Sequence, residues 1–338
     1  MNTPRLPARP RDGHKGTFGT VAIVGGCAAP PDTVGGAHMA GAPALAALGA
    51  LRIGAGLAKM VCPAAVLPTA IGLVPSATGI VLPTDADGCI VAHEAAAVLD
   101  QLVESADAIV IGPGLGSGGE HNTPSATAVE AIALRAIGQD LTPVVVDADA
   151  LNALARVPDL AREFRATAVL TPHPGEFRRL AAALNISHDP TDPTDATQRP
   201  LAAEALAQRL GCMVVLKGAG TVVSDGQRTW TCPNGHPCLA TAGTGDVLAG
   251  AIGGLIAQFV KPPDPLMAGL SAQARAALGA SSGNDPAAMD LFDAARAGVL
   301  IHALAGERWA SAHHASAGLL AAELAGLLPV CAESIRDG

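Results

Sequence analysis

The feature that most constrains the fold is an alternation of short apolar runs with alanine-rich segments. The apolar runs are nearly continuous, which is typical of strands in a parallel sheet that is covered on both faces. The segments between them carry apolar residues at helical spacing. Strand–loop–helix repetition of this kind predicts a three-layer α/β/α domain with a mostly parallel central sheet.

These patterns place the expected strands. We expect strands at Thr20–Val24, Leu57–Cys62, Ala108–Ile111, Pro143–Asp147, Ala168–Thr171 and Cys212–Lys217. The Asp225-Gly226 pair between Thr221–Val223 and Arg228–Cys232 predicts a β-hairpin, because glycine readily adopts the backbone angles of a tight turn.

The same patterns place the expected helices. We expect them at Ala42–Gly54, Ala95–Ser105, Ala126–Ile137, Gly175–Leu184, Leu201–Leu210, Asp246–Val260, Leu266–Gly279, Leu291–Arg308 and Leu319–Leu327. Asn185–Arg199 is polar and rich in proline, which predicts an exposed loop.

Length and composition favour a single large domain. The chain has 338 residues, of which 49% are hydrophobic and only 2% aromatic, so Ala, Leu, Val and Ile must build the core. We expect residues 1–13 to form a flexible tail and residues 14–338 to form one catalytic domain, with no internal repeat and no second domain before it.

Charge, cysteines and prolines exclude several classes of protein. A net charge of −9 without a basic patch argues against nucleic-acid binding. Seven scattered cysteines without a Cys-x-x-Cys pair indicate reduced thiols in a cytoplasmic protein and argue against a zinc site. Prolines interrupt the uncharged stretch 60–84, so it is not a membrane span, and residues 1–12 lack the apolar core of a signal peptide.

Gly243-Thr244-Gly245-Asp246 is the strongest candidate for a functional motif. Gly243 and Gly245 can adopt backbone angles closed to other residues and let a ligand approach the main chain. The first N–H groups of the following helix have no intrahelical acceptor and form an anion site. We expect the positive end of this helix to favour the ionised form of Asp246. A phosphate cradle beside an ionised base suits phosphoryl transfer to a hydroxyl.

Further motifs directly follow expected strands. They are Gly112–Gly116, Asp147–Asn152, Thr171–Glu176 and Lys217–Thr221. Ligands of open parallel sheets bind beyond the carboxyl ends of the strands. We therefore expect these loops to converge on one crevice.

Several of these residues also have an ordinary structural interpretation. Lys217–Thr221 is either a tight turn into a hairpin or a nucleotide contact. Glu176 suits a helix start as well as a ligand, and Asp147 and Asp149 are either strand-end caps, which we favour, or acids near a metal. His173 lies between two prolines and is either a surface histidine or a rigidly aimed binding residue.

In their order along the chain, the motifs closely resemble those of the ADP-dependent NAD(P)H-hydrate dehydratases, a branch of the ribokinase-like superfamily. The resemblance extends from about His14 to about Leu327. The segments that carry it are His14–Gly19, Gly41–Ala47, Ala50–Leu57, Ile111–Gly116, Val146–Asn152, Leu170–Phe177, Leu216–Thr221 and Gly243–Asp246. One segment departs from the family pattern, because Cys27 replaces the usual serine and the loop Ala28–His38 is longer.

The resemblance implies a role for particular residues. Asp246 is the catalytic base in this scheme. The hydrated nicotinamide nucleotide is bound by Ala42, Gly114, Gly116, His173 and Asp246, and ADP by Lys217, Gly218, Ala219, Gly220, Thr221, Gly243, Thr244 and Gly245. Mg²⁺ is expected as the cofactor of phosphoryl transfer, although the spacing of the acidic residues shows no cluster of metal ligands.

The resemblance also implies a ribokinase-like fold and a reaction. ADP phosphorylates the ring hydroxyl of hydrated NADH or NADPH, and loss of phosphate restores the dihydronicotinamide, with release of AMP and phosphate. Family members often assemble as tetramers, so a homo-oligomer is expected. Two alternatives are a kinase of the same fold, such as a hydroxyethylthiazole kinase, and a nucleotide sensor without turnover. His173 and Gly112–Gly116 argue against the first, and Asp246 argues against the second.

Overall fold

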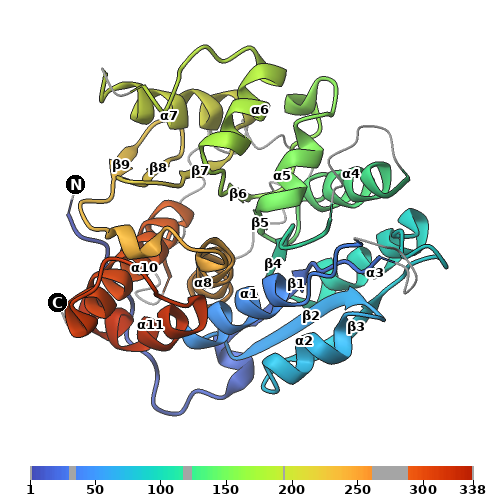
Figure 1. Cartoon of the computed structure of the whole chain (residues 1–338), viewed down its shortest axis with the longest axis horizontal. Helices are drawn as coiled ribbons and strands as arrows, with labels where there is room; N and C mark the ends of the chain where they lie inside the picture. The colour runs from blue at the N-terminus through green and yellow to red at the C-terminus, as the bar shows by residue number, and fades with distance from the viewer. Residues whose placement is uncertain (1, 30–35, 117–123, 193–194, 261–287, 337–338) are drawn as a thin grey trace.

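A nine-stranded sheet forms the centre of the molecule, with strand order β3-β2-β1-β4-β5-β6-β7-β8-β9 (Figure 1). The structure, a computed structural model, describes residues 2–29, 36–116, 124–192, 195–260 and 288–336. The strands from β1 to β7 run parallel, whereas β8 and β9 form the antiparallel hairpin that the sequence predicts. The strands are β1 Thr20–Val24, β2 Leu57–Pro63, β3 Thr78–Leu82, β4 Ala108–Ile111, β5 Val144–Val146, β6 Ala168–Leu170, β7 Met213–Leu216, β8 Val222–Ser224 and β9 Thr229–Thr231.

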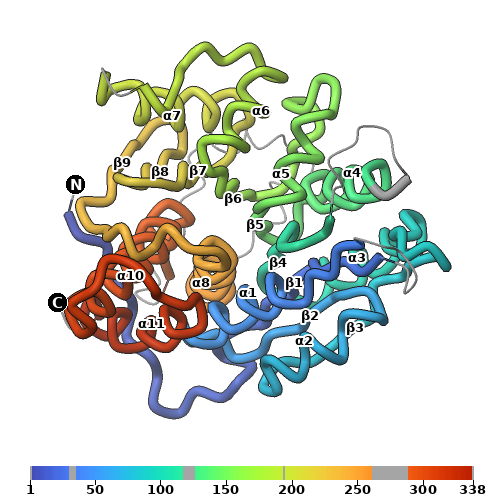
Figure 2. The backbone as a smooth tube through the Cα atoms, viewed as in Figure 1, coloured from blue at the N-terminus to red at the C-terminus, as the bar shows by residue number. Residues whose placement is uncertain are grey.

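Helices cover both faces of the sheet, as the sequence predicts for a three-layer α/β/α fold (Figures 1 and 2). The helices that pack on one face are α1 Gly41–Arg52, α2 Leu67–Leu73, α8 Thr244–Phe259, α10 Leu291–His313 and α11 Ala321–Arg336. The opposite face is covered by α3 Ala92–Ser105, α4 Pro124–Ile137, α5 Ala148–Leu154, α6 Pro174–Leu184 and α7 Gln198–Leu210. Successive strand residues such as Ala22 and Ile23 belong to different core clusters, because side chains alternate across a sheet.

In the described part of the chain, one strand and two short α-helices were not expected from the sequence. The strand β3 lies at the sheet edge and is mostly exposed, and its apolar run Ile80–Leu82 has only three residues between Gly79 and Pro83. The helices α2 and α5 have only seven residues each, too few for a periodic pattern. The last helix continues past Pro329 to Arg336, beyond the predicted end at Leu327, because its final turns also bury apolar residues. The helix expected at 266–279 lies outside the described residues.

The N-terminal segment, which we expected to form a flexible tail, lies against the C-terminal helices. The backbone N–H of Leu6 donates to the carbonyl of Ile335 at 3.4 Å, and the Leu6 side chain is buried. The Arg9 guanidinium donates to the Gly54 carbonyl at 2.9 Å and stacks over the Phe18 ring. Buried Arg296 on α10 donates to the carbonyl of Asn2. These contacts attach residues 2–9 to the domain.

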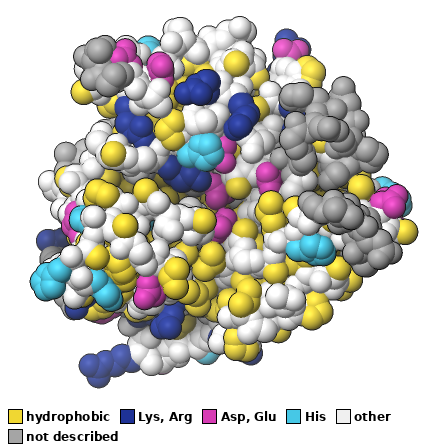
Figure 3. All heavy atoms as spheres, viewed as in Figure 1, with side chains coloured by type: hydrophobic (Ala, Val, Ile, Leu, Met, Phe, Trp, Pro, Cys, Tyr) yellow, Lys and Arg dark blue, Asp and Glu magenta, His cyan; other side chains and the backbone are white. Residues whose placement is uncertain are grey.

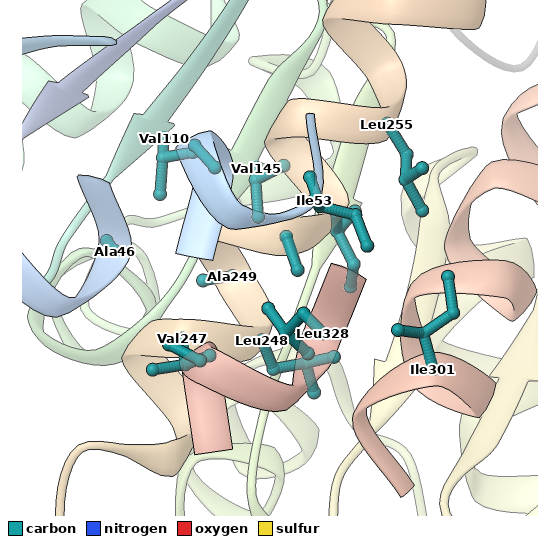
Figure 4. Packing of buried hydrophobic residues seen from close by; sticks show 14 of the residues in the cluster. Ala46, Ile53, Val110, Val145, Val247, Leu248, Ala249, Leu255, Ile301 and Leu328 are labelled. Carbon is teal, nitrogen blue, oxygen red and sulfur yellow. The ribbon is translucent and has the colours of Figure 1, made fainter. Parts of the chain in front are cut away.

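The helices α1 and α8 pack closely because glycines lie at their contact. Figure 4 shows hydrophobic residues packed in this region, among them Ala46 of α1 and Val247 of α8. A Cβ atom added to Gly250 would lie 1.9 Å from the Ala46 carbonyl oxygen, and one added to Gly49 would lie 2.4 Å from that of Val247. Ala44, Ala46 and Ala47 of α1 are buried as well, and their small side chains allow this close packing. This contact fixes the start of α8 against α1.

Replacing Gly250 with alanine should therefore destabilise the fold. We expect Gly250→Ala to lower the free energy of unfolding by about 1–3 kcal/mol, the range for overpacking a dense core. Chemical denaturation measures this loss. Gly72→Ala is the matched control, because a Cβ atom on this helical glycine meets nothing within 4 Å. A loss that is no larger for Gly250→Ala than for Gly72→Ala would contradict the packing argument.

The strand register brings the candidate loops to one edge of the sheet. Val24 is paired with Ile111, Ile111 with Val146, and Val146 with Leu170. Gly25, Gly112, Asp147 and Thr171 follow these strand ends, and Lys217 joins them because its N–H donates to the Pro172 carbonyl at 2.8 Å. Gly112, Asp147, Thr171 and Lys217 thus lie at the same end of the sheet, as predicted for the loops that they begin.

Candidate active site

A buried ion pair occupies the centre of the converging loops. Lys217 Nζ lies 2.6 Å from Asp147 Oδ1 and 3.9 Å from Glu176 Oε2. The side chains of Lys217, Asp147 and Glu176 are only 16%, 2% and 5% exposed. Burial alone lowers the pKa of Lys217, but the two carboxylates raise it overall, so the ammonium stays charged. Figure 3 shows acidic, basic and histidine side chains gathered near the middle of the viewed face, around the ends of β6 and β7 and beside α8.

Asp147 is part of this ion pair and not a helix cap. It occupies the N-cap position of α5, but its side chain makes no capping hydrogen bond. Its Oδ1 atom instead accepts the Thr171 hydroxyl at 2.7 Å as well as the lysine. Asp147 therefore lies at the strand end, as expected, where its side chain joins Thr171 and Lys217. Asp149, two residues further along the chain, accepts a hydrogen bond from the backbone N–H of Gly116 at 2.8 Å.

Asp246 lies in the first turn of α8 with a raised pKa. Burial is the main cause, Asp147 adds to it, and nearby Lys217 opposes it, so that the pKa reaches about 7. The expectation that the helix end favours ionised Asp246 is therefore wrong, because desolvation outweighs the helix charge. Asp246 can instead exchange a proton near neutral pH, as a general base requires.

The glycine turn before Asp246 forms the expected helix start. Gly243 is the N-cap of α8 with a left-handed φ of 88°, which glycine adopts without strain. Gly245 lies inside the helix without such an angle, and a Cβ atom there would make an ordinary contact of 3.5 Å with Lys217 Nζ, so the protein's own packing does not require glycine at this position. The Thr244 hydroxyl donates to the carbonyls of Leu239 and Thr241, both at 2.9 Å. The free N–H groups of this helix start therefore lie beside an ammonium group, which suits an anion.

His173 caps α6, which the sequence analysis did not anticipate. Its Nδ1 accepts the N–H of Gly175 at 2.9 Å, and the Glu176 carboxylate accepts the N–H of His173 at 2.8 Å. Burial and the charge of Lys217 lower the pKa of His173, so the ring is neutral with its proton on Nε2. Its side chain remains 52% exposed, so it can still contact a ligand. Glu176 is a helix-start residue, and burial raises its pKa to about 7. Together with Asp147 and Asp246 it forms the group of buried carboxyls around Lys217, here called the acidic cluster.

The predicted substrate residues near α1 also lie together. A Cβ atom on Gly114 would lie 3.1 Å from the Cβ of Ala42. Gly116 adjoins both Asp149 and Cys27, whose Sγ lies 2.5 Å from where a Gly116 Cβ would stand. The charge of Asp149 contributes to the raised pKa of Asp246. The residues around Gly116 are therefore coupled electrostatically to the candidate base Asp246. Residues 30–35 of the loop after Cys27 lie outside the described residues.

Five of the predicted nucleotide residues, Lys217–Thr221, form the turn between β7 and β8, here called the nucleotide loop (residues 217–221). Gly218 and Gly220 have left-handed φ angles of 137° and 66°. The Thr221 hydroxyl donates to the Gly218 carbonyl at 3.0 Å and closes the turn, while Ala219 is exposed. The loop is joined to the acidic cluster through Lys217, whose ammonium points toward Asp147.

Sequence reasoning missed two residues beside this site. Arg199, at the start of α7, binds carbonyls of the nucleotide loop. His302 Nε2 on α10 lies 2.9 Å from the Thr244 carbonyl oxygen, and burial lowers the pKa of this ring to about 4, so it is neutral and donates. No sequence motif identifies either residue, because each donates to backbone carbonyls of another segment, and such contacts leave no local pattern.

The family of this chain follows from its sequence matches. The family model of the NAD(P)H-hydrate dehydratases matches residues 33–329. The chain belongs to this family. It is 34% identical to the ADP-dependent (S)-NAD(P)H-hydrate dehydratase of Neisseria meningitidis serogroup B over 324 residues, covering 94% of this chain and 86% of that protein. It is 39% identical to the bifunctional NAD(P)H-hydrate repair enzyme Nnr of Salinibacter ruber over 292 residues, covering 85% of this chain but 49% of the relative. The chain thus spans about half the length of such bifunctional relatives.

A solved structure of the family supports the fold assignment. The ADP/ATP-dependent NAD(P)H-hydrate dehydratase from Bacillus subtilis, co-crystallised with ATP and Mg²⁺, matches with a TM-score of 0.66 and 27% identity. The match covers 99% of each chain. The fold is therefore the ribokinase-like α/β/α sandwich that the motifs imply. Among the residues described, no helix is long and apolar enough to cross a membrane.

Proposed function

We propose that this chain is an ADP-dependent (S)-NAD(P)H-hydrate dehydratase that repairs hydrated NADH and NADPH. The observation that carries the proposal is Asp246, a buried carboxyl with a pKa of about 7 at the start of α8, beside Lys217 and free helix N–H groups. Family membership and the named relatives support the same reaction.

In the proposed reaction, Asp246 accepts the proton of the ring hydroxyl as the hydroxyl oxygen attacks the β-phosphorus of ADP. The bond from this phosphorus to the bridging oxygen breaks, and AMP leaves. The N–H groups at the start of α8 and the Lys217 ammonium hold the transferred phosphoryl group and spread its charge. The carbon–oxygen bond of the phosphorylated ring then breaks, and phosphate leaves with the oxygen and the bonding electron pair. The neighbouring ring carbon loses a proton to the solvent or the departing phosphate, which forms the double bond and restores the dihydronicotinamide.

We propose Mg²⁺ as the cofactor, bound mainly through the nucleotide. The described residues contain no group of three or more His, Cys, Asp or Glu side chains that could hold a metal. Mg²⁺ commonly takes one or two carboxylates and completes its shell with phosphates and waters, and the acidic cluster supplies carboxylates of this kind. When bound, the ion would neutralise charge on the phosphates.

A homo-oligomer, for which a tetramer is the family expectation, and a cytoplasmic location are further proposals. Reduced cysteines support the location, since no disulfide joins the seven free thiols. The edge strand β3, with Val81 50% exposed, offers an unpaired edge to a second copy.

The direct test is recovery of NADH from its hydrate. Mixed with hydrated NADH, Mg²⁺ and ADP, the protein should restore the near-ultraviolet absorbance of NADH and release AMP and phosphate in equal amounts. A kinase of the same fold would leave a stable phosphorylated product, and a nucleotide sensor would bind ADP without consuming it. Recovery with ATP but not ADP would keep the reaction and change the donor. Flat absorbance with both donors, together with phosphorylation of a thiazole alcohol, would replace the proposal by the thiazole kinase.

A further inference from the structure

Arg199 on α7 connects three segments of backbone at the nucleotide loop. Its Nε donates to the Gly220 carbonyl at 3.1 Å, and its terminal nitrogens donate to the carbonyls of Pro190 and Leu216, both at 3.3 Å, and of Lys217. These bonds use most of the N–H donors of one guanidinium group. The side chain therefore fixes the loop at its start and near its end.

The glycine at position 218 leaves room for this guanidinium. A Cβ atom on Gly218 would lie 2.4 Å from a terminal nitrogen of Arg199. Gly218 also has a left-handed φ of 137°. The loop sequence and Arg199 therefore fit one another, although they lie in separate parts of the chain.

The charge of Arg199 has no counter-ion in the part of the chain that the structure describes. No carboxylate there lies within ion-pair distance of it. Carbonyl groups satisfy its hydrogen bonds but leave a net positive charge beside the loop. Because the side chain is half-buried, this charge is less screened than that of a surface arginine, and it favours an anion.

Arg199 also acts on the lysine of the acidic cluster. Lys217 is held at three points: its N–H donates to the Pro172 carbonyl at 2.8 Å, its carbonyl accepts from Arg199, and its ammonium reaches Asp147 at 2.6 Å. The guanidinium thus fixes the backbone of the residue that connects the nucleotide loop with the carboxylates.

We propose that Arg199 is a positioning residue of the nucleotide site, which holds the loop 217–221 in its binding geometry and adds positive charge for the phosphates of a nucleoside diphosphate. The identity of this ligand rests on the proposed function. The planar guanidinium is essential for positioning the loop, because its several N–H donors reach several carbonyls at once. A lysine supplies the same charge but cannot bind these carbonyls together.

The experiment compares Arg199→Lys with the unchanged protein and with Arg165→Lys. Arg165 is an exposed arginine that precedes β6, at the amino end of this strand and away from the nucleotide loop. Its replacement by lysine is the same chemical change and therefore serves as the control. For Arg199→Lys we expect the KM for ADP and the calorimetric Kd for ADP to rise at least about tenfold, with little change in the KM for hydrated NADH. Hydrogen exchange of amides 217–221 in the ligand-free protein should rise by a similar factor. Gly218→Ala, which displaces the guanidinium from the other side, should give the same pattern.

The outcomes separate this inference from the proposed function. Unchanged loop exchange and unchanged ADP affinity in Arg199→Lys would overturn the inference. Equal weakening for both substrates together with a lower Tm would also overturn it, since Arg199 would then support the fold alone. If the unchanged protein fails to convert hydrated NADH but Arg199→Lys still loses ADP affinity and loop protection, the proposed reaction falls and the positioning role stands.

Discussion

Asp246→Asn should lose turnover by roughly 10²-fold or more, the usual scale for a missing general base, while it keeps its fold and its affinity for ADP. The asparagine has the shape of the carboxyl and the charge of its protonated form. Because the pKa of Asp246 is about 7, that form is already well populated in the folded protein near neutral pH. Single-turnover kinetics and calorimetry with ADP measure the two effects separately.

The pH dependence gives this prediction a second readout. The base must be ionised, so turnover of the unchanged protein should fall as the pH drops below about 7. The contribution of Asp246 to the free energy of unfolding should change with pH in the opposite direction to turnover. A carboxyl whose pKa is raised on folding stabilises the fold below its unfolded-state pKa, and this contribution is lost as the pH rises through about 7. Asp246→Asn should therefore have a higher Tm than the unchanged protein at pH 8, and the difference should shrink toward pH 4.

Asp159→Asn is the matched control for this variant, because Asp159 is exposed and lies far along the chain from the glycine turn. It should leave turnover and the pH profile unchanged. A properly folded Asp246→Asn protein that retains turnover would remove Asp246 from the mechanism.

Much of the fold could be predicted because its central strands are buried on both faces. Runs such as Thr20–Val24 and Ala108–Ile111 are apolar except for Thr20 and are buried throughout, and the structure places both strands at these residues. The edge strand β3 could not be found in this way, since its apolar run Ile80–Leu82 is short and lies within the proline-interrupted stretch 60–84. Periodicity reports burial, so it fails for elements that bury little.

The site was predicted unevenly for a related reason. Glycine motifs marked the turns at Gly243 and Gly218, where backbone geometry dictates the residue type. The pKa of Asp246 was predicted in the wrong direction, because desolvation depends on neighbours from other loops. The pairing of Lys217 with Asp147 joins residues 70 positions apart, and no local pattern encodes such a contact.

Lys217→Met should destabilise the protein strongly, by about 3–5 kcal/mol at neutral pH, the range for breaking one side of a buried ion pair. Asp147 and Glu176 would remain buried without a cation, and the methionine would replace only the aliphatic part of the lysine. Lys15→Met at an exposed position is the control and should change little. Urea denaturation monitored by circular dichroism gives both free energies of unfolding.

The cause of this loss can be isolated with a second substitution and with pH. Asp147→Asn in the Lys217→Met background removes the uncompensated charge, so the double variant should regain much of the lost stability. The loss in Lys217→Met should also shrink as the pH falls, because the raised pKa values of Glu176 and Asp246, both about 7, rise further without the ammonium and these groups become neutral first in the folded state. If the loss of stability is independent of pH and additive with that of Asp147→Asn, Lys217 stabilises the fold by packing alone. The ion pair with Asp147 would then contribute nothing to the free energy of unfolding.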